Sequence, residues 1–144
     1  MDRKDIVLVV IESASDEGLS PLQLQKSLFI IGQSQLTGLP SDFYVFRPYN
    51  YGPFCEEIYH DTDTLVEEGM VYNIPMPGQS WSKYVITPKG QTKSEEIGKE
   101  NNIGLVAYIN ETVQWVKSLN FSELLRAIYA KYPEYSINSV FKDQ

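Results

Sequence analysis

The sequence has few of the residues from which metal and redox sites are built. Its 144 residues include one cysteine, Cys55, and one histidine, His60. A zinc site needs three or four ligands drawn mainly from these two residue types, so we expect no metal and no cofactor. A single cysteine cannot form an internal disulfide, which favours a reducing compartment and a cytoplasmic location.

Motifs for catalysis and phosphate binding are also missing. The sequence contains no Gly-x-Gly, no Gly-Lys-Ser/Thr and no nucleophile-elbow serine. His60, Asp61 and Asp63 are close in sequence, but on a helix they point in different directions. Cys55 is expected in the first turn of that helix, where the helix dipole lowers a thiol pKa and adjacent glutamates raise it. A small buried cysteine is the commoner outcome, and we expect that the protein is not an enzyme.

Long hydrophobic runs are absent as well. The run from Ile6 to Ile11 has six apolar residues and ends at Glu12. It is too short for the core of a signal peptide or for a membrane span, so we expect neither. A length of 144 residues suits one domain, and no shift in composition divides it. We therefore expect a single domain over residues 1–144.

The residues that are present predict an α+β fold in which helices predominate. Asp2, Ser20 and Thr87 are placed as helix N-caps, with proline at the first helical position after the last two. We expect helices over 2–14, 53–68, 88–100, 103–119 and 122–131. A further helix should begin at 21 and end somewhere between 32 and 38. We expect strands over 42–48, 70–74 and 84–87, with a hairpin loop over 75–83. This order predicts a winged helix-turn-helix core over residues 1–90 and a helical extension over 91–144 packed on it.

Four segments in this order resemble a known family. They are Leu24-Gln25-Lys26-Ser27-Leu28-Phe29, Phe46-Arg47-Pro48-Tyr49-Asn50-Tyr51-Gly52-Pro53-Phe54, Gly69-Met70-Val71, and Tyr84-Val85-Ile86-Thr87-Pro88-Lys89-Gly90. Together they are similar to YwgA-like proteins and to the Panacea domain of SocA-type antitoxins. The resemblance implies a winged-helix fold and, for the Panacea-type domains, binding to a toxin through protein contact. Cys55 departs from the family pattern, which has serine there.

The strongest feature of the charge pattern is the helix expected over 53–68. The chain carries a net charge of −7, and this helix has six acidic residues and no lysine or arginine. In a DNA-binding winged helix the corresponding helix enters the major groove, where carboxylates would be repelled by phosphate. We predict that its outward side contacts a protein partner, such as a toxin or a regulatory protein. The residues predicted to bind are Glu56, Glu57, His60, Asp63 and Glu67, together with Trp81 in the hairpin loop.

Other interpretations of these residues stay open. The acidic face can simply be solvated, with Glu56 and Glu57 favoured by the positive end of the helix dipole. Trp81 can fold back on its own hairpin instead of contacting a partner. The alternative function is DNA binding through Lys83, Lys89 and Lys93, which would contact phosphates without reading sequence.

The last two helices are amphipathic. Apolar residues recur at helical spacing from Val106 to Val116 and again from Leu124 to Tyr129. Most of them should belong to the core. Packing against a second copy of the chain is the alternative, which would make the protein a homodimer.

Overall fold

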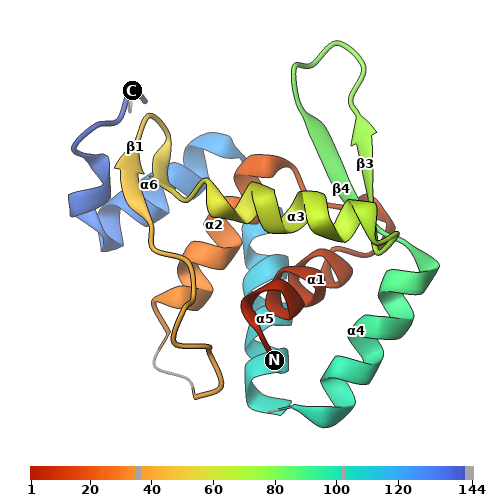
Figure 1. Ribbon diagram of the computed structural model, residues 1–144. Helices are drawn as coiled ribbons and strands as arrows, with labels where there is room; N and C mark the ends of the chain where they lie inside the picture. The colour runs from red at the N-terminus through yellow and green to blue at the C-terminus, as the bar shows by residue number, and fades with distance from the viewer. Residues whose placement is uncertain (35–36, 102, 142–144) are drawn as a thin grey trace.

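The computed structural model describes residues 1–34, 37–101 and 103–141, and it confirms an α+β fold that is mostly helical (Figure 1). Side-chain caps at Asp2, Ser20, Thr87 and Asn120 start four of the helices. In chain order the elements are α1 (Arg3–Ser13), the 3-10 turn η1 (Ser15–Glu17), α2 (Pro21–Gly32), β1 (Arg47–Tyr49), β2 (Gly52–Phe54), α3 (Glu57–Glu67), β3 (Val71–Pro75), β4 (Ser82–Ile86), α4 (Pro88–Glu100), α5 (Ile103–Ser118), α6 (Phe121–Lys131) and the 3-10 turn η2 (Pro133–Ser136).

Helix α1 lies at the centre of the fold. Asp2 caps it as predicted, because its side chain accepts a hydrogen bond from the Asp5 N–H and the Asp5 side chain accepts one from the Asp2 N–H. All six residues from Ile6 to Ile11 are buried, since α2, α3, α4, α5 and β4 all contact this helix. The apolar run therefore belongs to a helix that several other elements pack against (Figure 1).

The segment between α2 and α3 differs from its prediction. The strand expected over 42–48 shrinks to β1, which pairs antiparallel with β2 through a two-residue turn at Asn50 and Tyr51. Pro53 belongs to β2 and does not open a helix, so α3 begins at Glu57. Cys55 consequently lies ahead of α3 and not in its first turn, and it is buried.

The β3–β4 hairpin projects from the helices and is anchored at its base (Figure 1). Tyr84 forms a backbone bridge with Leu19, which precedes α2. Thr87 donates a hydrogen bond to the Gly69 carbonyl over 2.7 Å and accepts one from the Gly90 N–H, so it joins the end of α3 to the start of α4. Gly69 has a φ of +77°, which agrees with its predicted place just beyond the helix end.

The C-terminal helices pack on the rest of the chain. Leu105, Ile109 and Val113 of α5 share one hydrophobic core with the buried side of α1. Helix α6 and η2 lie against the β1–β2 hairpin, and Phe29 of α2 contacts the ring of Tyr135 edge-on. Within the described ranges, no helix is long and apolar enough to cross a bilayer.

The first residues of α4 give a stability test. A methyl group on Gly90 would lie 2.0 Å from the Met70 carbonyl oxygen, so Gly90→Ala must displace the backbone before β3. We expect a loss of about 2–3 kcal/mol in the free energy of unfolding, measured by urea denaturation. Gly98→Ala in the same helix is the control, because a methyl group there meets nothing within 4 Å. It should stabilise the protein by about 0.5–1 kcal/mol, and equal effects at the two positions would contradict the packing described.

Candidate functional site

The first candidate surface is formed by α3, whose side chains fall on separate faces. Ile58, Thr62 and Leu65 recur at helical spacing and are buried, as the sequence predicts for Ile58 and Leu65. The Thr62 hydroxyl donates to the Ile58 carbonyl one turn earlier, so this polar group is satisfied inside the core. The apolar face fixes the rotation of the helix and therefore decides where its carboxylates lie.

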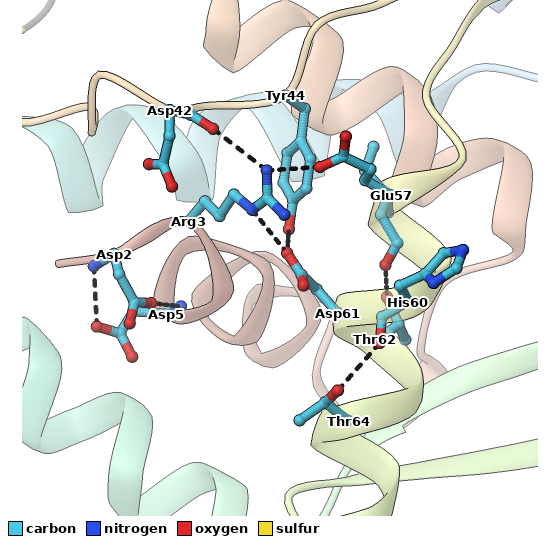
Figure 2. Close-up of polar contacts among 11 residues, drawn as sticks. Asp2, Arg3, Asp5, Asp42, Tyr44, Glu57, His60, Asp61, Thr62 and Thr64 are labelled. Carbon is cyan, nitrogen blue, oxygen red and sulfur yellow. Dashed lines mark hydrogen bonds and ion pairs between the residues drawn. The ribbon is translucent and has the colours of Figure 1, made fainter.

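One row of carboxylates is paired with cations of α1, and Figure 2 shows the Arg3 part of it. Arg3 forms ion pairs with Glu57 over 2.8 Å and with Asp61 over 3.0 Å. Lys4 forms an ion pair with Glu68 over 3.0 Å. Three of the six acids on this segment thus have a cationic partner, and they contribute little to the charge offered to a binding partner.

Tyr44 closes this cluster from the opposite side. Its hydroxyl donates to the Asp61 carboxylate, and the Arg3 guanidinium lies 4.9 Å from the centre of its ring. Burial of the tyrosine, together with the hydrogen bond to Asp61, raises the pKa of Tyr44. The hydroxyl is therefore a permanent donor at neutral pH. This arrangement positions the start of α1 against α3.

A second row faces solvent and is not neutralised. Glu56, His60, Asp63 and Glu67 are exposed, and none of them forms an ion pair with a residue in the described ranges. Figure 2 shows the His60 ring pointing away from the Arg3 cluster. We call these four residues the acidic row. Glu57, predicted to belong with them, is instead turned toward Arg3, although its side chain remains 64 % exposed.

A pocket of about 570 Å³ lies beside this row. Tyr59 and Trp81 both line it, and Tyr59 sits on α3 between Glu56 and Asp63. Six aromatic residues contribute to its walls: Tyr49, Tyr51, Phe54, Tyr59, Trp81 and Phe121. Trp81 is 37 % exposed, so the residue predicted to bind a partner lies at the wall of a cavity and is partly open to solvent.

Two polar side chains of α2 connect the pocket floor to the segment before α3. The Gln25 amide donates to the Cys55 carbonyl over 2.8 Å and accepts from the Cys55 N–H over 3.0 Å. The Lys26 ammonium donates to the Pro53 carbonyl over 2.9 Å. Two of the sequence segments that carry the family resemblance are therefore bonded to each other. We refer to these three hydrogen bonds as the α2 clamp.

Lys26 is a residue that sequence reasoning missed as a site residue. It lines the pocket yet is only 3 % exposed, and burial lowers its pKa to about 7. A signal was available, because Lys26 is the only charged residue between Pro21 and Gly32 in a helix rich in leucine and isoleucine. Charged residues in such a setting are costly to bury and are seldom found there without a role.

The three lysines of the DNA-binding alternative do not gather in one patch. Lys83 lies on β4, whereas Lys89 and Lys93 lie on α4, and the hairpin and α4 extend in opposite directions from Thr87 (Figure 1). Lys89 also donates to the Glu68 carbonyl at the end of α3 over 2.9 Å. Its ammonium group is therefore already engaged with a backbone carbonyl at the C-terminal end of α3. Such a spread favours ordinary surface lysines over a continuous phosphate-binding face.

Possible metal ligands and the surface of α5 and α6 are the other features that the sequence raised. No cluster of His, Cys, Asp or Glu that could hold a metal ion occurs among residues that the structure describes. Trp115, expected mostly in the core, is 43 % exposed beside a second pocket of about 340 Å³ between α5 and α6. The homodimer through these helices stays a prediction.

Burial of Lys26 predicts a pH dependence of stability. The pKa falls from 10.5 to about 7 on folding, so the folded protein binds fewer protons than the unfolded chain between these values. The free energy of unfolding should therefore rise with pH in that interval, by up to about 1.4 kcal/mol per pH unit from this group. Lys26→Met should lack this contribution. Urea denaturation of both proteins from about pH 7 to about pH 9 measures the difference; parallel profiles would contradict it.

Comparison with known proteins does not assign the chain to a family. No family model matches the chain, and no curated protein matches it in a sequence search. The likeness to YwgA-like and Panacea-type proteins therefore rests on the four sequence segments alone. The acidic row and the pocket are the features that bear on function.

Proposed function

We propose that this protein is a non-catalytic winged-helix interaction module that binds a protein partner through the acidic row and Trp81. The observation that carries this proposal is the division of charge on α3. Arg3 and Lys4 pair with Glu57, Asp61 and Glu68, and the carboxylates of Glu56, Asp63 and Glu67 are left unpaired at the surface. A surface rich in lysine and arginine is the complementary partner.

The order of elements supports the winged-helix part of the proposal. Helices α1, α2 and α3 precede a β-hairpin, and the bridge between Leu19 and Tyr84 adds a third backbone segment beside that hairpin. A simple helix-turn-helix joins its helices by a turn of about three or four residues. Here the β1–β2 hairpin occupies the connection between α2 and α3, so the proposed fold is an elaborated version with its own aromatic surface.

Recognition of a protein suits the chemistry of the surface better than recognition of DNA. Trp and Tyr are enriched where proteins meet, because they combine apolar area with a polar group. Trp81, Tyr49 and Tyr51 are all exposed next to the acidic row. A DNA-binding face would instead need lysine and arginine on α3, where the sequence has none. The resemblance to Panacea-type antitoxins makes a toxin one candidate class of partner.

Charge reversal tests the proposal. The triple substitution Glu56→Lys, Asp63→Lys and Glu67→Lys places like charges opposite a basic partner, which costs several kcal/mol. We expect partner capture from an extract of the native host to fall at least about tenfold. Thermal denaturation should show that the variant remains folded, since none of the three forms an ion pair in the described structure.

A matched variant on α4 serves as the control. Glu95, Glu96 and Glu100 are exposed, and replacing all three by lysine changes the net charge by the same amount. This variant should retain the partner. Equal loss in both triple variants would show that only overall charge matters, and undiminished capture by the α3 variant would overturn the assignment of the surface.

A further inference from the structure

The pocket beside α3 has a charge that contrasts with the rest of the molecule. The chain has 19 acidic and 12 basic residues. Of the described residues that line the pocket, none is acidic and one, Lys26, is basic. A cavity of about 570 Å³ falls within the range of pockets that hold small organic ligands. Its walls therefore favour an anionic group in a protein that is otherwise negative.

Lys26 has no counter-ion to neutralise it. Its ammonium donates to the Pro53 carbonyl, and no carboxylate pairs with it within the part of the chain that the structure describes. An ammonium group has three N–H donors, so donors remain for a second partner. Burial without an opposite charge lowers the pKa of Lys26 to about 7, and a carboxylate that entered the pocket would favour the charged ammonium.

Two helix N-termini add positive potential at the same place. Helix α2 begins at Pro21 and α6 begins at Phe121, and both residues line the pocket. The N-terminal end of a helix carries a partial positive charge that favours anions. Glu123 in the first turn of α6 is the nearest acid along that helix, and its carboxylate is engaged with the Asn120 N–H over 2.9 Å.

The remaining wall is aromatic. Phe54 stacks on Tyr49 with 5.0 Å between ring centres, and Tyr59 and Trp81 complete a surface for a flat apolar group. Burial raises the pKa of Tyr59, so its hydroxyl is neutral near pH 7 and adds no negative charge. The ligand that satisfies all of these features has an aromatic body and one carboxylate.

We propose that this pocket binds a small aromatic carboxylate, whose ring lies against Tyr59 and Trp81 and whose carboxylate pairs with the Lys26 ammonium. The site goes beyond the protein-binding surface, because it uses the interior of the pocket and not the acidic row, and Trp81 is the residue that the two share. The same chemistry is carried by a free aromatic acid and by the C-terminal carboxylate of a peptide that ends in an aromatic residue.

Trp81 provides the readout. The chain has two tryptophans, so Trp115→Phe leaves Trp81 as the only one. We expect 3-phenylpropionate to change the emission of Trp81 in a saturable way, and the neutral isostere 3-phenylpropanamide to bind about tenfold more weakly or worse, because it loses the charge-assisted hydrogen bond. N-acetylphenylalanine stands for a peptide terminus, and its affinity relative to 3-phenylpropionate distinguishes the two sources.

The opposite tryptophan variant controls for location. Trp81→Phe leaves Trp115, which lines the second pocket between α5 and α6. Its emission should not change with 3-phenylpropionate. A response there that matched the response of Trp81 would indicate unspecific binding and would overturn the assignment.

Substitutions in the pocket test the role of charge. Lys26→Met in the Trp115→Phe background should bind the acid and the amide equally. Phe121→Glu is a second variant, for the case that Lys26→Met does not fold: it adds a carboxylate at the first position of α6, where the dipole favours it. It should weaken 3-phenylpropionate about tenfold relative to Phe121→Gln and leave the amide unchanged. Equal affinity of the wild-type pocket for acid and amide, or no saturation at millimolar acid, would overturn the proposal.

Discussion

The α2 clamp joins helix α2 to β2 and to the segment that lies between β2 and α3. Gln25 satisfies both backbone groups of Cys55, and Lys26 satisfies the carbonyl of Pro53. These bonds hold β2 against α2. Because they engage the backbone of Pro53 and Cys55, α3 begins after them, at Glu57. The clamp therefore sets the floor of the pocket. It also fixes where α3 begins and therefore where its acidic residues lie. The same three hydrogen bonds thus position both the pocket and the acidic row.

The acidic helix has a structural role on one side of its axis and, in our proposal, a binding role on the other. Glu57, Asp61 and Glu68 hold the N-terminal residues Arg3 and Lys4. Exposed ion pairs of this kind contribute only about 0–1 kcal/mol each, so their importance lies in where they leave the charge. The paired acids are turned toward α1, the acidic row faces solvent, and the neighbouring pocket has a lysine and no acid among its lining residues. A partner with a basic surface and a small aromatic acid would thus occupy adjacent places without competing for the same charge.

The sequence predicted those features that local contacts determine. Ser20 and Gln23 cap α2 within one turn, and Thr87 caps α4 in the same way, so both helix starts were confirmed. The strand over 42–48 and the helix start at Pro53 were wrong because distant residues decide them. Cys55 is held by a side chain 30 positions earlier, and the Tyr44 ring turns inward toward Asp61. Likewise, Lys26 stands out in the sequence as the one charged residue of α2, but its burial depends on the β1–β2 hairpin, whose Pro53 carbonyl accepts its hydrogen bond.

We propose that α3 repels nucleic acid and presents its charge to a protein. Fluorescence anisotropy of a labelled random-sequence DNA duplex, titrated with the full chain at low ionic strength, tests this most directly because non-specific binding is then strongest. We expect no saturable binding of the DNA duplex to the protein. Saturable binding that disappears when Lys89 and Lys93 are replaced by glutamate would contradict it and would assign the protein to DNA.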